Sequence, residues 1–226
     1  MTVPPRIRVW DLPTRIFHWA LVALAVFSFT TGKIGGDWMA WHLRSGYAVL
    51  TLLLFRLLWG LVGSTTSRFA HFVRGPRAAI AHARNLLATR TAVAFGHNPL
   101  GGWMILLMLA AFLLQAVSGL FSDDEIATQG PLAAKVSNAM VSRMSALHSY
   151  NEWLLVALAA LHLAAIATYT FVLRAPLVGA MVHGTTVHGP SGAVRGFRES
   201  PTWLAALLLA NCAGFVYWLV VVFARG

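Results

Sequence analysis

Five long runs of apolar residues divide the chain, and shorter polar segments separate them. A bilayer core about 30 Å thick is crossed by about 20 mostly apolar helical residues. Each run is close to that length, so the pattern predicts five transmembrane helices. They are expected over Ile16 to Thr31, Trp41 to Val62, Pro99 to Phe121, Ala146 to Leu173 and Thr202 to Ala224.

The first run also has the basic leader and apolar core of a signal peptide. It is rich in aromatic residues, however, and lacks a clear small-x-small cleavage site. We therefore expect it to be a helix of the folded protein. Between the third and fourth runs lies a 24-residue segment, Ser122 to Ser145. A short amphipathic helix is expected within it, over residues 132 to 144.

Composition supports a membrane protein. The chain has 226 residues, of which 58% are hydrophobic and 11% charged, whereas soluble domains carry about 25% charge. The length suits a single helix bundle. The net charge of +10 does not indicate nucleic-acid binding, because the basic residues lie between apolar runs rather than along one stripe. Basic loops beside apolar spans favour an anionic membrane surface instead.

The distribution of basic residues predicts the orientation. One side would carry Arg6, Arg8, Arg15, Arg68, Arg74, Arg77, Arg84, Arg90, Arg174, Arg195 and Arg198. The other side would carry Lys33, Lys135, Arg143 and Arg225, with most of the acidic residues. The N-terminus is therefore expected in the cytoplasm and the C-terminus outside. Cys212 is the single cysteine and lies in an apolar run. Because there is only one cysteine, a disulfide framework within the chain and a C-x-x-C-H haem attachment are excluded.

Two histidines of the fourth span carry the strongest chemical signal. His148 and His162 are 14 residues apart, which is about 40° short of four helical turns and about 21 Å along the axis. Both then face the same side, near opposite membrane surfaces. Zinc ligands on a helix are typically three or four residues apart, so this spacing favours two stacked haems over a zinc site.

Each haem of an electron carrier usually takes two axial ligands from the protein. His42 opens the second span at the same depth as His148, so these two are expected to bind an outer haem. His18, near the cytoplasmic end of the first span, is expected to pair with His162 around an inner haem. His18 and His162 match less well in membrane depth than His42 and His148 do. His97, just before the third span, is therefore the alternative to His18 as a ligand. No role is assigned to the loop residues His71, His82, His183 and His188.

Arg56 lies 14 residues after His42, on the same face of the second span. A buried arginine needs an anionic partner, and a propionate of the inner haem would serve. The alternative is an arginine that reaches the lipid–water interface. Gly46, Gly101 and Gly102 could let a flat macrocycle approach a helix, or simply allow helices to pack closely.

Several motifs together resemble the bacterial cytochrome b561 family, which includes the b-type cytochrome subunits of nickel–iron hydrogenases and is similar to those of formate dehydrogenases. The resemblance covers roughly residues 6 to 174. Its motifs are Val9-Trp10-Asp11, Arg15-x-x-His18-Trp19, His42-Leu-Arg-Ser-Gly46, Phe55-Arg56-Leu57-Leu58-Trp59-Gly60, Gly96-His97-Asn98-Pro99-Leu100-Gly101 and the spacing of His148 and His162.

The resemblance implies a four-helix bundle around two bis-histidine haems b. It implies electron exchange between ubiquinone or menaquinone and a hydrogenase, a dehydrogenase or a c-type cytochrome. Asn98 and Gly101 become candidate quinone contacts, although Asn98 could equally be a helix cap. The expected organisation is a di-haem domain over 1–174, a cytoplasmic loop over 175–201 and a further transmembrane helix over 202–226. The resemblance places such a protein in the bacterial inner membrane.

Two other functions stay open from the sequence. Some relatives in this broad family oxidise superoxide and pass the electron to quinone, and Arg44, Lys135 and Arg143 could attract the anion. A transporter or plain membrane anchor is the third candidate, since intramembrane histidines also relay protons. No internal repeat or pair of broken helices of the transporter kind is visible.

Overall fold

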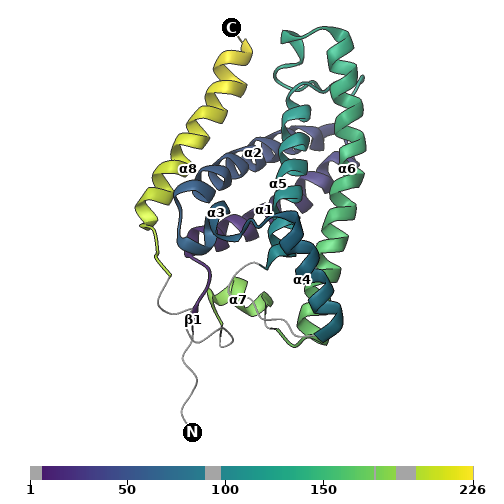
Figure 1. Cartoon of the computed structure of the whole chain (residues 1–226). Helices are drawn as coiled ribbons and strands as arrows, with labels where there is room; N and C mark the ends of the chain where they lie inside the picture. Colours follow the sequence, from purple (N-terminus) through teal and green to yellow (C-terminus); the bar gives the residue numbers. More distant parts are fainter. Residues whose placement is uncertain (1–6, 90–97, 176, 187–196, 226) are drawn as a thin grey trace. The chain divides into compact units, whose positions relative to one another are not determined.

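Five long helices account for most of the chain (Figure 1), and the computed structural model describes residues 7–89, 98–175, 177–186 and 197–225. The long helices are α1 Leu12–Ile34, α2 Met39–Val62, α5 Pro99–Leu120, α6 Asn138–Ala167 and α8 Thr202–Tyr217. π-Helical segments extend two of them, α6 by η4 Thr168–Val172 and α8 by η6 Trp218–Phe223. All five are long and apolar enough to cross a membrane. The prediction of an all-α membrane protein with five spanning helices is confirmed.

Short elements connect the long helices. They are β1 Ile7–Arg8, η1 Gly36–Trp38, η2 Thr65–Ser67, α3 Phe69–Phe72, α4 Pro76–Thr89, η3 Ala133–Lys135, α7 Leu177–His183 and β2 Thr185–Thr186. The segment after the fourth span was expected to be a plain loop, but it contains α7 and β2. The strand β2 pairs with β1 in antiparallel register, with Ile7 opposite Thr186.

Helix α1 begins four residues earlier than predicted because Asp11 caps it. Oδ1 of Asp11 accepts a hydrogen bond from the backbone N–H of Thr14 at 2.8 Å, which satisfies one of the free donors of the first turn. Its Oδ2 accepts from Nε1 of Trp59 at 3.1 Å and from Oγ of Ser67 at 3.0 Å. This fully buried carboxylate therefore ties α1 to α2 and η2. As a result, His18 lies more than one turn inside α1.

Helix α6 also begins earlier than predicted, at Asn138 instead of Ala146. The separate amphipathic helix predicted over residues 132 to 144 is therefore wrong. A short 3₁₀ turn, η3, is followed directly by the first turns of α6. Those turns mix apolar residues with Ser142, Arg143 and Ser145, so the apolar run was taken to begin only at Ala146. The helix still continues through them, because no glycine or proline interrupts residues 138 to 146.

The chain divides into two compact units, and each long helix contributes residues to both. The first unit consists of Met1–Ile16, Leu58–Leu107 and Leu158–Ala205. The second unit consists of Phe17–Leu57, Met108–Ala157 and Ala206–Gly226. In the first unit, Val9 and Trp10 are buried against Ala180 of α7. Their backbone N–H groups donate to the carbonyl oxygen of Gly184, at 2.8 and 3.2 Å respectively.

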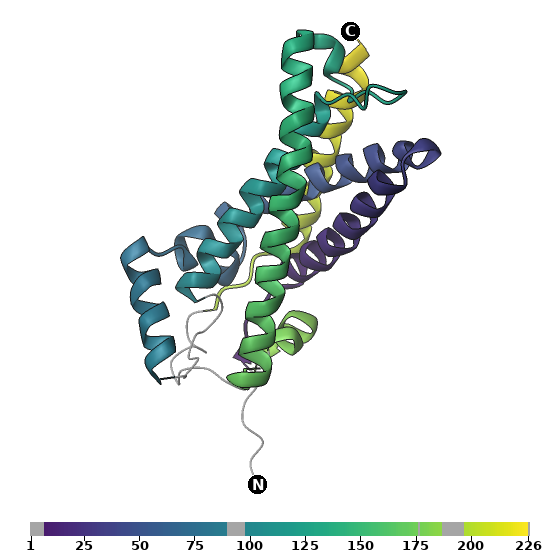
Figure 2. The same cartoon turned by 90° about the vertical axis from the view of Figure 1, so that its right-hand side faces the viewer.

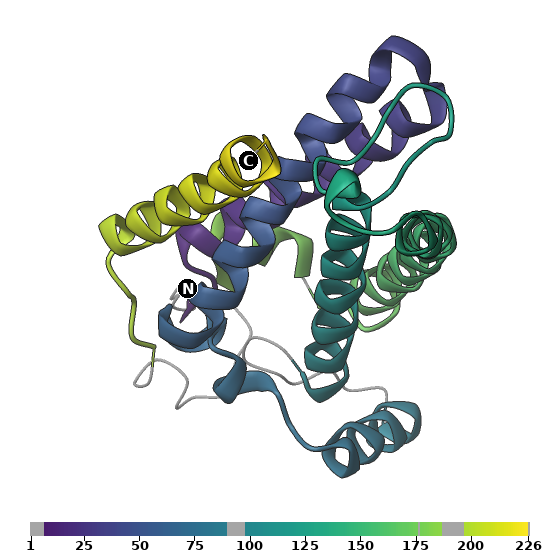
Figure 3. The same cartoon turned by 90° about the horizontal axis from the view of Figure 1, so that it is seen from above.

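The second unit contains the hairpin of α1 and α2, whose tight turn is visible in purple and blue in Figure 2. It also contains the loop from α5 to α6, drawn in teal and seen from above in Figure 3. Lys33, near the end of α1, forms an ion pair with Glu152 of α6 at 2.5 Å. A buried apolar cluster joins α2, α5, the loop and α8 through Leu50, Leu120, Leu132 and Val216.

Candidate functional site

The second unit brings together two of the predicted histidines. His42 lies in the first turn of α2, and His148 lies in α6. The centroids of their imidazole rings are 6.0 Å apart, and the ring planes are nearly perpendicular, at 87°. The two histidines predicted to share the outer site are therefore neighbours in the fold, although they are more than 100 residues apart in sequence.

Backbone carbonyl groups orient both imidazoles. Nδ1 of His42 lies 2.8 Å from the carbonyl oxygen of Ser28 in α1, and Nδ1 of His148 lies 3.0 Å from that of Gln115 in α5. A carbonyl oxygen only accepts, so each Nδ1 carries the hydrogen and donates it. This tautomer leaves the lone pair on Nε2. Metal-binding histidines are typically held in this way, with the second ring nitrogen fixed by an outer partner.

The two rings are close enough to act at one site. Their centroid separation of 6.0 Å and perpendicular planes are those of an edge-to-face pair. The Nε2 atoms of this pair are the groups that could hold a metal ion. Within the described ranges, no group of three or more His, Cys, Asp or Glu side chains could hold a metal ion. Two imidazoles with no further protein ligand fit haem iron, whose other ligands come from the porphyrin.

Glycines make room for both rings. A Cβ atom on Gly32 would lie 2.8 Å from Nδ1 of His42, and one on Gly119 would lie 2.9 Å from Cε1 of His148. Both distances are too short for a real side chain, so glycine allows each neighbouring helix to approach the imidazole. Gly46 is different, because a Cβ there would meet nothing within 4 Å. The space beside Gly46, one turn after His42, is open to a flat group.

A polar network next to His148 was not identified from the sequence. Asn151 is buried, with 4% of its surface exposed. Its Nδ2 donates to the carbonyl oxygen of Ala111 at 2.9 Å and to Oε1 of Gln115 at 2.7 Å. Ser118 also contacts Nδ1 of His148, at 3.2 Å. These bonds connect α5 to α6 at the level of the histidine. The available signal was the presence of amide side chains inside two otherwise apolar helices.

The other predicted ligands are not brought together within one unit. His18 belongs to the second unit, where its ring meets that of Trp19 edge to face at 4.9 Å. His162 belongs to the first unit. Their pairing therefore stays a prediction, and the competing residue, His97, lies outside the described residues. Arg56 is only 3% exposed, which favours the interpretation of a buried arginine over that of one reaching the lipid–water interface.

Asn98 caps α5, as one of the two interpretations of the sequence expected. Its Oδ1 accepts a hydrogen bond from the backbone N–H of Gly101 at 2.7 Å, and Pro99 occupies the first helical position. Nδ2 of Asn98 donates to Oη of Tyr169 at 2.8 Å. Sequence reasoning did not identify Tyr169, since a tyrosine at the end of a span is ordinarily read as an interface anchor.

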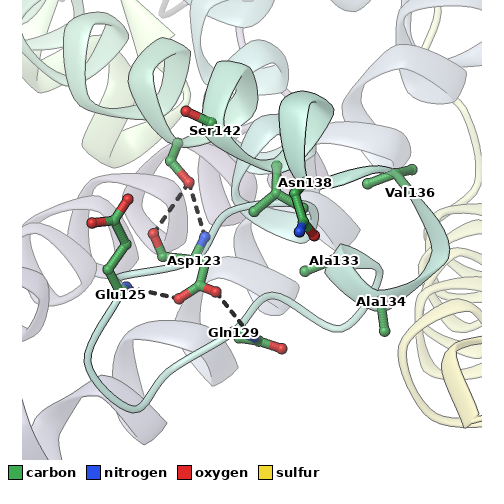
Figure 4. A pocket seen from close by; sticks show the side chains of 10 residues that line it. Asp123, Glu125, Gln129, Ala133, Ala134, Val136, Asn138 and Ser142 are labelled. Carbon is green, nitrogen blue, oxygen red and sulfur yellow. Dashed lines mark hydrogen bonds between the residues drawn. The ribbon is translucent and has the colours of Figure 1, made fainter.

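A pocket of about 390 Å³ lies beside the loop from α5 to α6 (Figure 4). The carboxylate of Asp123 accepts hydrogen bonds from the backbone N–H of Glu125 and from Nε2 of Gln129, both at 2.7 Å. The backbone N–H of Asp123 donates to Oγ of Ser145 at 2.9 Å. The polar groups of the pocket thus stabilise the loop itself, and the pocket includes none of the predicted site residues.

The acidic residue next to this pocket has a shifted pKa. The backbone N–H of Thr128, supported by those of Ile126 and Ala127, lowers the pKa of Asp124 to about 2. These bonds are 2.8, 3.0 and 2.9 Å long, respectively. Asp124 is therefore ionised at any physiological pH and holds the tip of the loop in its turn conformation.

Comparison with known proteins identifies the family. No protein with curated annotation and no solved structure matched the chain. The sequence model of one family, described as prokaryotic cytochrome b561, matches residues 9–184. That range includes the four histidines of the candidate site and the capped start of α5. The chain thus belongs to the prokaryotic cytochrome b561 family, and it is a membrane b-type cytochrome that binds haem and takes part in electron transfer.

Proposed function

We propose that this cytochrome carries electrons between a membrane quinone and a redox partner protein through two haem b groups. The observation that carries the proposal is the His42–His148 pair, with its ring separation of 6.0 Å and both Nδ1 atoms bonded to backbone carbonyl oxygens. Family membership accounts for haem b and electron transfer. The number of haems, the quinone and the partner are parts of the proposal.

In the second unit, His42 and His148 would hold the iron of one haem. When bound, haem iron supplies one-electron redox chemistry. The chain itself fixes the tautomer of each ligand, provides space beside Gly46 and places the site among apolar helices. Each of these contributions keeps the ligands in one geometry, so little rearrangement is needed when the charge at the site changes.

His162 would bind the second haem, with His18 as its partner and Arg56 as the group that binds a propionate. The spacing of His148 and His162 supports this, because α6 is a regular helix between them and presents both on one face. The early start of α1 at Leu12 supports it too, since His18 then lies inside the helix. The burial of Arg56 suits an anionic group brought in by a cofactor.

The quinone site is proposed near the start of α5, around Asn98 and Gly101.

The many arginines of the N-terminal tail and of the segments before α5 and α8 support a cytoplasmic N-terminus and an outer C-terminus in a bacterial inner membrane. The partner would be a hydrogenase, a dehydrogenase or a c-type cytochrome. If the partner binds on the side opposite the quinone, electron flow also moves charge across the membrane. The di-haem part would comprise residues 1–174, with 175–201 as a cytoplasmic connection to the last helix.

The reduced-minus-oxidised spectrum and haem-to-protein ratio of the purified full-length chain test this proposal. We expect a b-type spectrum and a ratio of about two, with low-spin iron as bis-histidine ligation requires. A haem-to-protein ratio of about one would show that His18 and His162 do not form a haem site. High-spin iron throughout would contradict the assignment of His42 and His148 as a pair.

A further inference from the structure

The end of α6 carries a tyrosine in an unusual backbone setting. The last five residues of the span, Thr168–Val172, form a π-helical turn. Such turns are rare and occur frequently at functional sites, because they insert one extra residue and change the direction in which a side chain points. Here the turn contains Tyr169, whose side chain is half-buried. The next residue, Thr170, has a buried hydroxyl with no hydrogen-bond partner among the described residues.

Three elements of the first unit meet at the phenol of Tyr169. Nδ2 of Asn98, at the start of α5, lies 2.8 Å from Oη of Tyr169. Nε2 of His82, from α4, lies 3.5 Å from the same oxygen, at the edge of hydrogen-bonding distance. The phenol is therefore the point where α4, α5 and the end of α6 are linked by polar side chains.

The cap of α5 determines which way these hydrogen bonds run. Oδ1 of Asn98 is already occupied by the backbone N–H of Gly101 at 2.7 Å. The amide nitrogen must then face Tyr169, and because an amide N–H only donates, the phenol oxygen accepts. When Nε2 of His82 carries the ring hydrogen, it also donates to the phenol oxygen, and the O–H hydrogen of Tyr169 is left for another acceptor. Asn98 therefore has its oxygen engaged in the cap and its nitrogen engaged with Tyr169.

Tyr169 is also on the same span as a proposed haem ligand. It follows His162 by seven residues, which is about 10 Å along the axis. Tyr169 thus lies beyond His162, towards the end of the span. A quinone head group that exchanges electrons with a haem at His162 would be bound at this end.

We propose that Tyr169 is the residue that donates a hydrogen bond to a carbonyl oxygen of the membrane quinone, and that Asn98 acts through Tyr169 as a positioning residue. The inference rests on the proposed function, since it assumes a quinone near the haem of His162. It differs from a direct contact between Asn98 and the quinone. The phenol supplies the donor that a quinone carbonyl requires, and the amide of Asn98 holds the phenol oxygen in place.

The test uses the purified, haem-loaded, full-length chain and its Tyr169→Phe variant. A short-chain ubiquinol and a short-chain menaquinol are tested as electron donors to the haem, and binding of the matching oxidised quinones is measured by calorimetry in detergent. We expect the half-saturating quinol concentration and the quinone dissociation constant to rise about five- to tenfold in the variant, as for the loss of one hydrogen bond. The spectrum and the haem content should not change.

Two further variants separate binding from structure. Tyr150→Phe removes an exposed phenol elsewhere on α6 and should leave both constants unchanged. Asn98→Ser keeps a capping oxygen for α5 but loses the amide donor, so a smaller rise in the same constants is expected. Adding Asn98→Ser to Tyr169→Phe should have no further effect on quinone binding, because Asn98 acts through the phenol.

The outcomes distinguish this inference from the proposed function. If Tyr169→Phe keeps normal haem content and binds quinone as tightly as the wild type, the assignment of Tyr169 is wrong while the cytochrome function stands. Additive effects of the two substitutions would overturn the indirect role of Asn98. Loss of haem from Tyr169→Phe would assign the residue to structure and reject the inference. Wild-type protein with full haem that neither quinol reduces would refute the proposed function, and the inference with it.

Discussion

The polar sites of the two units are built in different ways. In the second unit, His42 and His148 are held by backbone carbonyl oxygens of neighbouring helices, and glycines bring those helices into contact with the rings. In the first unit, the side-chain hydrogen bonds of Tyr169, Asn98 and His82 to other described residues join these three to one another and to a helix cap. A permanently bound cofactor requires fixed ligands, whereas a ligand that enters and leaves requires hydrogen bonds that can be exchanged. The two constructions match these two requirements.

The largest effect should come from two single substitutions, one of a histidine in the second unit and one of a histidine in the first unit. His148→Ala and His162→Ala should each lower the haem-to-protein ratio from about two to about one, because the proposed arrangement assigns the two histidines to different haems. The two variants should retain haems with different redox potentials, which a potentiometric titration would resolve. His71→Ala, at an exposed position of α3, is the control and should keep both haems. If both substitutions removed the same haem, the two-site arrangement would be wrong.

A smaller effect is expected from filling the space next to one imidazole. In Gly119→Ala the new Cβ would lie 2.9 Å from Cε1 and 3.2 Å from Nδ1 of His148, so the ring must shift. Overpacking of this kind costs about 1–3 kcal/mol, and thermal loss of haem absorbance should occur at a lower temperature. The matched control is Gly179→Ala in α7 of the first unit, where a Cβ would meet nothing within 4 Å. Equal behaviour of the two variants would argue against a tightly fitted His148.

The smallest effect concerns pH and the loop of the second unit. Backbone N–H groups lower the pKa of Asp124 from 3.8 to about 2, so the folded loop favours the ionised carboxylate. Its stabilising contribution is complete above pH 3.8 and is lost as the pH falls through about 2. The protection of residues 124 to 128 against hydrogen exchange, relative to the intrinsic rate at each pH, should therefore fall in this range. Asp124→Asn should remove this change in protection, and haem content should be unaffected in both proteins at neutral pH.

The spans could be predicted from the sequence, but their ends could not. Twenty apolar residues in a row have few alternatives to a transmembrane helix. The ends depend on individual capping side chains and on turns of mixed polarity that hydropathy does not detect. Helix α1 starts earlier than predicted because Asp11 caps it, and α6 starts at Asn138 because no glycine or proline interrupts the mixed polar and apolar residues before Ala146. Both starts follow from local chemistry that an average over a window conceals.

The same limit applies to the candidate site. The positions of His42 and His148 could be matched in depth from sequence alone, because a helix rises by a constant distance per residue. Their hydrogen-bond partners could not, because a backbone carbonyl is present at every residue and leaves no mark in the sequence. Tyr169 was missed for a different reason, since a tyrosine at the end of a span is ordinarily read as an interface anchor, and the π-helical turn that contains it has no mark in the sequence.

The hydrogen bonds from the two imidazoles to backbone carbonyl groups have a consequence for sequence variation. Because Ser28 and Gln115 hold the rings through their carbonyl oxygens, replacing either side chain leaves the acceptor in place. Natural variants should therefore tolerate many residues at position 28, while positions 32 and 119, where only glycine fits, should scarcely vary. Position 115 is restricted for a separate reason, because Oε1 of Gln115 accepts a hydrogen bond from the buried Asn151.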